Sequence, residues 1–260
     1  MPRRKEILAG LGHATNPTLV VDFDGTMSPI VERPETARPV AGAVDALNAL
    51  AARGVEVAVL SGRPISFLQQ ALVGLSERVR LIGHSGLERL TNGTVMVEPE
   101  AESWLPAVRA AHRQAVELAD DRLVIEDKRL SFSIHYRGAA DLEDAARSLA
   151  DRVGTGGLSP ERGKMHVEIR PPVSIDKGTA LRTIVAEATD WALYAGDDVV
   201  DVPAFAALRS ISAGSAFCVA VGTAESPSAL LDAADLVVSG PREMVELVEA
   251  MVEARASDVR

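Results

Sequence analysis

The 260-residue sequence predicts an α/β protein whose Rossmann-like, doubly wound parallel sheet is interrupted by an inserted α+β cap. Short apolar runs alternate with helical segments near both ends of the chain, which is typical of strands in a parallel sheet. In the middle, the order α-β-β-α-β-β favours a small antiparallel sheet. We therefore assign residues 1–100 and 171–260 to the core and residues 101–170 to the cap.

The first part of the core contains three predicted strands and two helices. Apolar runs at Thr18–Asp22, Val55–Leu60 and Arg80–Ile82 each end in polar or glycine residues, as buried strands do at a sheet edge. Helical spacing of apolar residues extends over Gly42–Arg53. Pro64 suits the first turn of a second helix, which we expect to end near Val73.

The second part of the core repeats this alternation. Lys177–Ala188 is a predicted helix, followed by strands at Trp191–Ala195 and Phe217–Val221. The basic start, Arg3-Arg4-Lys5, is interpreted as a solvated tail.

The predicted cap contains helices and strands of a different order. The helices are Glu102–Leu118 and Asp141–Val153, and the strands are Arg122–Glu126, Leu130–Tyr136, Met165–Arg170 and a weaker one near Leu158.

Charge is distributed unevenly along the chain. The formal net charge is −10, of which residues 101–170 contribute −1 and the remaining residues −9. An acidic chain is a poor nucleic-acid binder, because such binding needs a basic surface. The cations of the middle segment can steer a doubly charged phosphate ester to the protein. We therefore expect a small-molecule substrate and no nucleic-acid partner.

Three features indicate a cytoplasmic protein without membrane association. No apolar run approaches the ~18 residues that a membrane-spanning helix needs. The apolar stretch Ile7–Leu11, after the basic start, is too short for the hydrophobic region of a secretory signal. The single cysteine, Cys218, excludes an internal disulfide and fits a reducing compartment.

Two acids follow the first predicted strand, in Asp22-Phe-Asp24-Gly-Thr26. Side chains two residues apart on an extended segment point the same way, so both can act on one substrate. One carboxylate can attack phosphorus while the other transfers the leaving-group proton. Gly25 would let the backbone approach a phosphate closely. The alternative is an ordinary turn at the end of a strand.

Other polar residues are predicted at the same sheet edge, where open α/β sheets bind ligands. Ser61 can donate a hydrogen bond to a phosphoryl oxygen, and Lys177 can offset the repulsion between a carboxylate and a phosphate dianion. Asp197 would complete a carboxylate set suited to Mg²⁺. The alternatives are a helix cap at Ser61, a surface lysine, and a helix cap at Asp197-Asp198.

Together with Asp201, these residues resemble the haloacid dehalogenase superfamily of phosphotransferases. The resemblance implies that Asp22 is the nucleophile, forming an aspartyl-phosphate, and that Asp24 is the general acid and base. It implies Mg²⁺ held by the Asp22 carboxylate, the Asp24 backbone carbonyl and Asp197. Asp198 or Asp201 would contact these ligands without binding the ion directly. The implied phosphate-binding residues are Gly25, Thr26, Ser61, Gly62 and Lys177.

A narrower resemblance is to the trehalose-6-phosphate phosphatase family, over roughly Leu19 to Val238. It rests on the segments Asp22-Phe-Asp-Gly-Thr-Met-Ser-Pro-Ile-Val31, Ser61-Gly-Arg63, Gly86-Leu-Glu88, Glu126-Asp-Lys128, His135-Tyr-Arg137, Glu168-Ile-Arg-Pro171, Lys177-Gly178 and Gly196-Asp-Asp198. It implies Mg²⁺-dependent hydrolysis of trehalose 6-phosphate to trehalose and phosphate, as in trehalose biosynthesis. It also makes a separate trehalose-6-phosphate synthase a candidate functional partner.

The resemblance implies that the cap binds the sugar. Carboxylates with Lys or Arg can supply both the acceptors and the donors that sugar hydroxyls need. His135 is expected to order the sheet, and Arg170 is left out of the site. The implied substrate-binding residues are Glu126, Lys128, Arg137, Lys164, His166 and Glu168.

Two departures from the family pattern leave alternatives open. Val202 and Pro203 stand where the family often has acids, so metal affinity is expected to be weaker, and a non-catalytic sugar-phosphate sensor remains an alternative. Ser85 stands where the family often has histidine. A relative acting on another sugar phosphate, such as sucrose 6-phosphate, is the nearest rival.

Overall fold

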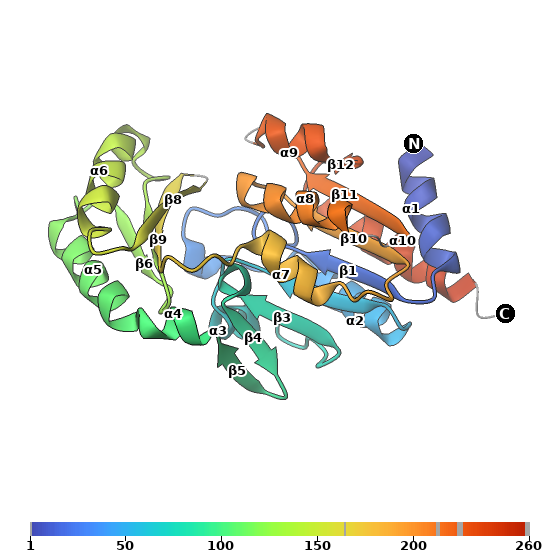
Figure 1. Cartoon of the computed structure of the whole chain (residues 1–260). Coiled ribbons are helices and arrows are strands. Elements are labelled where there is room, and N and C mark those ends of the chain that lie inside the picture. Colours follow the sequence, from blue (N-terminus) through green and yellow to red (C-terminus); the bar gives the residue numbers. More distant parts are fainter. Residues whose placement is uncertain (1, 164, 212–213, 223–225, 258–260) are drawn as a thin grey trace. The chain divides into compact units, whose positions relative to one another are not determined.

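The computed structural model of the chain describes residues 2–163, 165–211, 214–222 and 226–257 (Figure 1). The chain divides into two compact units. The core unit comprises Met1–Leu90 and Ile175–Arg260, and the cap unit comprises Thr91–Ser174. The borders of the cap unit thus lie outside the residues 101–170 expected from the sequence.

The larger sheet has the strand order β12-β11-β10-β1-β2-β3-β4-β5, and all of it except β5 and the last residue of β4 belongs to the core unit. Six of these strands run parallel, and β4 pairs with β3 in the antiparallel sense. The strands are β1 (Pro17–Val21), β2 (Glu56–Leu60), β3 (Val79–Gly83), β4 (Glu88–Thr91), β5 (Thr94–Val97), β10 (Trp191–Gly196), β11 (Ser215–Val221) and β12 (Leu236–Val238). The chain order reverses between β1 and β10, which makes this pair the switch point of the sheet.

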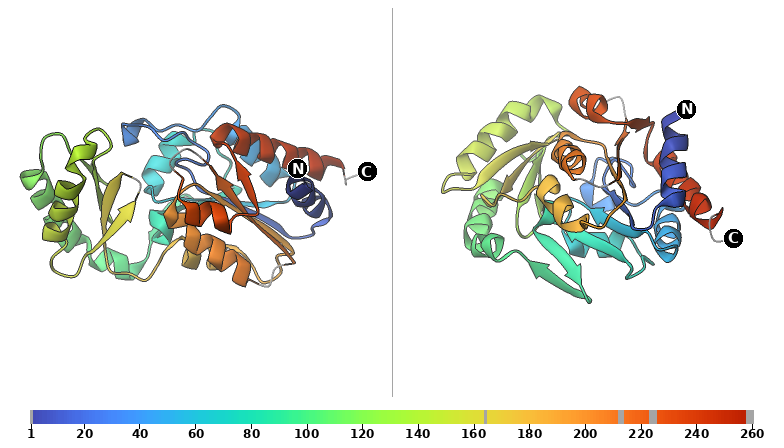
Figure 2. Two further views of the ribbon diagram at one scale, coloured as in Figure 1. Left: turned by 90° about the horizontal axis from the view of Figure 1, so that it is seen from above. Right: turned by 45° about the vertical axis from the view of Figure 1, so that its right-hand side comes forward.

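Helices cover both faces of this sheet, as the left view of Figure 2 shows. Alternate residues of each strand point to opposite faces, so Leu19 and Val21 pack with one layer and Val20 packs with the other. The first layer is α1 (Pro2–His13), α2 (Ala43–Ala52), α3 (Ile65–Ala71) and α10 (Pro241–Ser257), and the second is α7 (Lys177–Ile184), α8 (Val202–Ser210) and α9 (Ser228–Ala233).

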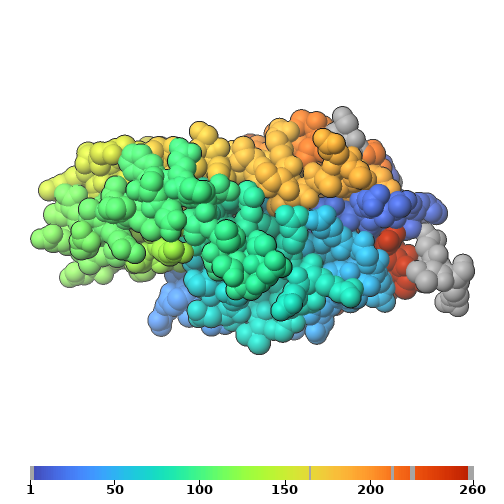
Figure 3. Space-filling view, turned by 60° about the horizontal axis from the view of Figure 1, so that its bottom comes forward, coloured from blue at the N-terminus to red at the C-terminus, as the bar shows by residue number. Residues whose placement is uncertain are grey.

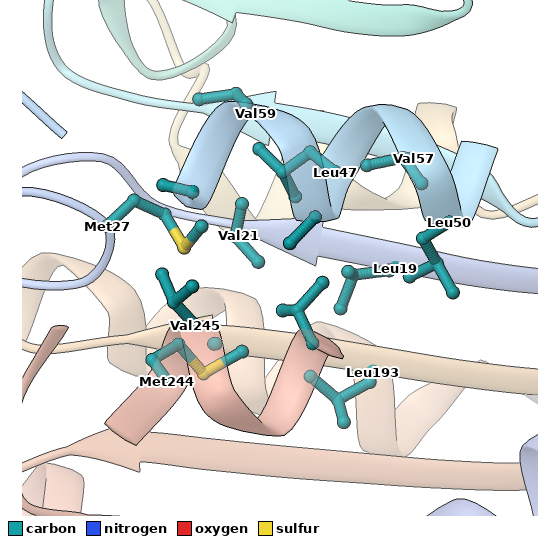
Figure 4. Packing of buried hydrophobic residues seen from close by; sticks show 14 of the residues in the cluster. Leu19, Val21, Met27, Leu47, Leu50, Val57, Val59, Leu193, Met244 and Val245 are labelled. Carbon is teal, nitrogen blue, oxygen red and sulfur yellow. The ribbon is translucent and has the colours of Figure 1, made fainter. Parts of the chain in front are cut away.

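The first layer shows why the two distant segments of the core unit fold together. Leu47 of α2 and Met244 and Val245 of α10 pack around β1 and β10 at Val21 and Leu193 (Figure 4). In the space-filling view the blue-to-teal and orange-to-red segments adjoin on the surface of this unit (Figure 3). Each fully buried aliphatic side chain of this kind contributes about 1.5–3 kcal/mol to folding.

The structure confirms the predicted α/β class with its parallel core sheet, but several elements differ from the expectations. Helices α8, α9 and α10 and strand β12 were not predicted. The basic start is not a solvated tail: it lies in α1, whose Ile7 and Leu11 are fully buried in the core. The hairpin of β4 and β5 was not predicted, because Glu88–Thr91 and Thr94–Val97 are short, largely polar or exposed strands without a long apolar run.

The cap unit carries a separate antiparallel sheet with the order β6-β7-β9-β8. Its elements are α4 (Pro99–Ser103), α5 (Leu105–Leu118), β6 (Val124–Asp127), β7 (Phe132–His135), α6 (Glu143–Val153), β8 (Ser159–Gly163) and β9 (His166–Arg170). Phe132 and Ile134 of β7 pack against α5 and α6. The intervening residues, Ser133 and His135, therefore belong to the opposite, polar face of the sheet.

None of the described helices is both long and apolar enough to cross a lipid bilayer.

Candidate active site

Two of the predicted site residues follow the neighbouring strands at the switch point. Asp22 comes directly after β1, and Asp197 comes directly after β10. Val21 is in register with Ala195, and the Asp22 N–H donates to the Ala195 carbonyl at 2.9 Å. This pairing holds the two strand ends side by side, at the sheet edge where such folds bind ligands. Both acids are buried.

Lys177 is positioned by the N-terminus of α7. The Asp176 carboxylate accepts a hydrogen bond from the Thr179 N–H at 2.7 Å, and the Thr179 hydroxyl accepts one from the Asp176 N–H at 2.8 Å. This capping box sets where the helix begins. The Lys177 Nζ then lies 2.9 Å from Asp22 Oδ1 and 2.7 Å from Asp201 Oδ1, with all three side chains buried.

Asp201 accepts hydrogen bonds on both carboxylate oxygens. Oδ1 accepts from Lys177 and from the Tyr194 hydroxyl at 2.5 Å. Oδ2 accepts from the backbone N–H groups of Asp197 at 3.0 Å and Asp198 at 3.1 Å. With both oxygens engaged, Asp201 holds the turn that carries Asp197.

The sequence analysis missed Tyr194. It is fully buried on β10, and its ring packs against Phe205. Burial, and to a smaller extent the negative charge of Asp201, raises the pKa of Tyr194 well above 10. Its hydroxyl therefore remains a hydrogen-bond donor. A tyrosine inside a buried strand needs a polar partner, and its position just before the Gly196-Asp197 turn is the signal that could have identified it.

Burial is the largest influence on the charge of Asp22 in this cluster. Burial raises the pKa of Asp22 to about 7, although the Lys177 ammonium acts in the opposite direction. Burial lowers the pKa of Lys177, but the carboxylates of Asp201 and Asp22 together raise it by more. The pKa of Lys177 therefore lies above its ordinary value. Lys177 thus contacts two buried carboxylates, and a third, that of Asp197, is buried at the end of the neighbouring strand.

Asp24 is less buried than Asp22 and pairs with a residue to which the sequence analysis gave no role. Its carboxylate accepts hydrogen bonds from the Arg63 guanidinium at 2.7 and 2.8 Å. The Ser61 hydroxyl oxygen accepts from the Arg63 N–H at 3.2 Å, which leaves the Ser61 proton free to point elsewhere. Ser61 follows β2 directly, as Asp22 follows β1.

The predicted phosphate-binding residues around these acids have distinct environments. Gly25 has a φ of +72°, and a Cβ built on it would lie 2.0 Å from Asp197 Oδ2, so the glycine makes room for that carboxylate. The Thr26 hydroxyl is buried and has no hydrogen-bond partner among the residues that the structure describes. Gly62 lies beside Ser85, whose Oγ would be 3.9 Å from an added Cβ.

Asp198 serves as a helix cap. Its side chain accepts a hydrogen bond from the Val199 N–H at 2.7 Å, at the start of a short 3₁₀ helix, Val199–Asp201. The cap alternative considered for the Asp197-Asp198 pair therefore holds for the second acid, while Asp197 is buried beside Gly25.

In the cap unit, the predicted site residues Glu126 and Glu168 belong to the polar face of the sheet. Strand register places Glu126 opposite Ser133, and Ser133 opposite Glu168. The Glu126 carboxylate lies 2.7 Å from His135 Nε2, which fits the ordering role expected for this histidine. The Ser133 hydroxyl, between the two acids in register, is buried and has no hydrogen-bond partner in the described part of the chain.

Glu168 and Lys128 form a pair inside the cap unit. Lys128 Nζ donates to Glu168 Oε2 at 3.1 Å, and the Ser131 hydroxyl donates to Oε1 at 2.6 Å. Burial raises the pKa of Glu168, but Lys128 and then Arg170 outweigh it, so the pKa lies well below its usual range. Sequence reasoning missed Ser131 and left out Arg170, which shares the face of Glu168 at spacing i, i+2.

The remaining predicted cap residues are less closely joined to this pair. The His166 ring lies against Gly163, where a Cβ added to the glycine would be 2.2 Å from His166 Cε1. The ring centroids of His166 and His135 are 5.3 Å apart. Arg137 follows the end of β7 and is half-buried. Lys164 lies outside the described residues.

Sequence comparison connects both units to one family. The family model described as "Trehalose-phosphatase" matches residues 20–235. The chain belongs to the trehalose-phosphatase family. A relative named "Trehalose-phosphate phosphatase" from Mycolicibacterium paratuberculosis is 36% identical over an alignment of 207 positions, which covers 75% of this chain and 52% of that protein. The chain therefore spans about half the length of the trehalose-phosphate phosphatases it matches.

Solved structures support the fold of this trehalose-phosphatase family member. A structure described as a "trehalose-6-phosphate phosphatase related protein" has a TM-score of 0.78 and 24% identity, and covers 92% of this chain and 99% of its own. A haloacid dehalogenase-like hydrolase from Bacteroides thetaiotaomicron has a TM-score of 0.59 and 18% identity, covering 90% and 99%. The core sheet and separate antiparallel sheet are thus those of the haloacid dehalogenase fold.

The acids of this family member fit a divalent cation. One carboxylate oxygen each from Asp22, Asp197 and Asp201 lie within 4.8 Å of one another. Buried carboxylates that lie close together are costly, and Mg²⁺ binds oxygen ligands of this kind. Because Asp201 already accepts hydrogen bonds on both oxygens, Asp22 and Asp197 are the better candidates for direct ligands.

Proposed function

We propose that this chain hydrolyses trehalose 6-phosphate to trehalose and inorganic phosphate, using Mg²⁺ and an aspartyl-phosphate intermediate. The observation that carries the proposal is the buried contact of the Asp22 carboxylate with Lys177, 2.9 Å away, beside Asp197 at the switch point of the sheet. Such a site supplies a nucleophile, a fixed positive charge and a cation site together. Membership of the trehalose-phosphatase family supports the choice of substrate.

The Asp22 carboxylate, the Asp24 backbone carbonyl and the Asp197 carboxylate would hold Mg²⁺. The ion would supply positive charge that offsets the repulsion between the phosphate dianion and the carboxylates. Asp201 would hold the Asp197 turn in place through its two backbone N–H contacts. Asp198, which caps the following 3₁₀ helix, would stabilise the same turn.

In the first half-reaction, an Asp22 oxygen forms a bond to phosphorus as the bond from phosphorus to the sugar oxygen breaks. The electron pair of the broken bond goes to the sugar oxygen, which takes a proton from Asp24. The Lys177 ammonium stays protonated and stabilises the negative charge beside Asp22. The buried Thr26 hydroxyl and the Ser61 proton are available as donors to phosphoryl oxygens.

In the second half-reaction, Asp24 takes a proton from water while the water oxygen attacks phosphorus. The bond between phosphorus and Asp22 breaks, which releases phosphate and restores the carboxylate. Asp24 thus alternates between acid and base and regains its starting state. The co-reactant is water, and no oxidant or reductant is required.

We assign sugar binding to the polar face of the cap unit. Glu168, held by Lys128 and Ser131, presents a fixed carboxylate for sugar hydroxyls. Glu126, ordered by His135, presents a second one. A site that hydrogen-bonds substrate hydroxyls rejects analogues that lack them, because its polar groups would remain unpaired. Arg137, Lys164 and His166 complete the proposed set, and a synthase partner remains a prediction from the sequence.

The test is phosphate release from a panel of sugar phosphates, with and without Mg²⁺, by the unchanged chain and by Asp22→Asn. We expect turnover of trehalose 6-phosphate that needs Mg²⁺ and falls at least about 10³-fold in Asp22→Asn, as when other catalytic nucleophiles are removed. Comparable turnover by Asp22→Asn would contradict the nucleophile assignment. Faster turnover of sucrose 6-phosphate than of trehalose 6-phosphate would overturn the substrate assignment. Absence of turnover for every ester would favour a non-catalytic sugar-phosphate sensor.

A further inference from the structure

Arg63 contacts Asp24 in a geometry that fixes the carboxylate. Nε donates to Oδ2 at 2.7 Å, and Nη2 donates to Oδ1 at 2.8 Å, so both oxygens are engaged at once. The side chains are 9% and 28% exposed, which limits screening by solvent. A bidentate guanidinium–carboxylate pair defines the plane of the carboxylate as well as its distance, which a single point charge does not.

The guanidinium is itself held in place. Its Cζ lies 4.4 Å from the centroid of the Phe67 ring, and Phe67 packs edge-on against Phe23, which lies between Asp22 and Asp24 in the chain. Stacking of this kind restricts the arginine plane and is stronger where solvent is excluded. The arginine therefore reaches Asp24 from a rigid support.

The backbone of Arg63 is also anchored. Its carbonyl accepts from the His84 N–H at 3.0 Å, and the following helix begins with the Ile65 N–H donating to the buried Glu88 carboxylate at 2.8 Å. Two contacts to the chain after β3 thus fix the loop that carries Arg63.

We propose that Arg63 is a positioning residue that sets the orientation of the Asp24 carboxylate for proton transfer. The proposal rests on the role of Asp24 in the proposed function and adds to it the group that orients this acid and base. Asp24 stands just before the turn at residues 25–27 and its side chain is partly exposed, so its own backbone leaves the side-chain rotamer open. Orientation of a catalytic group is worth large rate factors, because small displacements lengthen the path of the proton.

The test compares two esters with different leaving groups. The alkoxide of a sugar needs a proton to depart, whereas p-nitrophenolate departs without one. In Arg63→Met and Arg63→Lys we expect kcat/KM for trehalose 6-phosphate to fall about 10- to 100-fold. We expect kcat/KM for p-nitrophenyl phosphate to change less than about threefold, since that step needs no proton from Asp24. Lysine restores the charge without the planar fork and should not restore the rate.

Two further variants keep the outcomes distinct. Asp24→Asn should show the same dependence on the leaving group; if it does not, the acid–base role of Asp24 fails, and the proposal with it. Arg80→Lys, which alters the ion pair of Arg80 with Glu56 on the same sheet, should leave both esters unaffected. With unchanged melting temperature, equal losses on both esters would place Arg63 on the phosphate and overturn the proposal. Full activity on both esters in Arg63→Met would overturn it as well.

Discussion

The core unit and the cap unit present their polar side chains in different ways. In the core unit, Asp22 and Asp201 converge on Lys177 inside the protein, at the ends of parallel strands. In the cap unit, Glu126 and Glu168 lie in register on one face of an antiparallel sheet. Parallel strands collect residues from distant chain segments at one edge, whereas an antiparallel sheet arrays nearby residues across a face.

This difference extends to the electrostatics of the two units. Burial dominates at Asp22 and raises its pKa to about 7. At Glu168 the neighbouring cations Lys128 and Arg170 outweigh burial and lower the pKa. Burial therefore disfavours the charged form of Asp22, whereas the neighbouring cations favour the charged form of Glu168. Substitutions in the core should affect both catalysis and folding, and those in the cap should mainly affect substrate selection.

The largest effect is expected for Lys177→Met. Removing the ammonium leaves Asp22 and Asp201 buried without their shared cation, which typically costs about 3–5 kcal/mol of unfolding free energy. Phosphate release should fall at least about 10³-fold, because a charge placed at the reacting group is lost. Denaturant unfolding and a phosphate assay measure the two effects.

Lys5→Met is the matched control, because Lys5 is exposed on α1. It should change neither quantity. If Lys177→Met kept the unfolding free energy of the unchanged chain, the buried ion pairs would not be a folding determinant of the core unit.

A smaller and more selective effect is expected for Glu168→Gln. This change removes the charge that Lys128 faces, and it replaces one of the two carboxylate acceptors proposed for sugar hydroxyls with an amide donor. We expect kcat/KM for trehalose 6-phosphate to fall about 10- to 100-fold, while kcat/KM for p-nitrophenyl phosphate stays within about threefold. Steady-state kinetics with both esters measure the ratio.

Glu161→Gln is the control for the cap, since Glu161 is in register with Glu168 on β8 and pairs with Arg170 at 2.9 Å. It should leave the ratio of the two esters unchanged. Equal losses on both esters in Glu168→Gln would show that this face does not select the sugar.

The smallest effect is expected for Tyr194→Phe. It deletes the hydroxyl that donates to Asp201 at 2.5 Å, and a hydrogen bond to a charged group is worth about 1.5–3 kcal/mol. Denaturant unfolding should show this loss. The other tyrosine, Tyr136, lies 3.4 Å from Glu143 in the cap unit, so Tyr136→Phe should cost less. A larger loss in Tyr136→Phe would contradict the view that the buried core cluster is the more demanding one.

Local sequence patterns predicted most of the described strands, because apolar runs and spacing are set by neighbouring residues, but they did not predict helices α8, α9 and α10. They did not predict that α1 packs on the core, because most of this short helix is polar and its buried side includes only a few apolar residues, such as Ile7 and Leu11. They also placed the end of the helix that begins at Lys177 too late, at Ala188 rather than Ile184, because the turn before β10 carries no strong helix stop signal.

The sequence by itself determined the α/β class and the family, since Asp22-Phe-Asp24-Gly-Thr26, Lys177 and Gly196-Asp197 are local motifs in a fixed order. Only the tertiary structure decided which partner each group has. Arg63 and Asp24 are 39 residues apart, and Ser131 and Glu168 are 37 apart. Such contacts depend on strand order and register, which bring distant segments together and leave no local pattern in the chain.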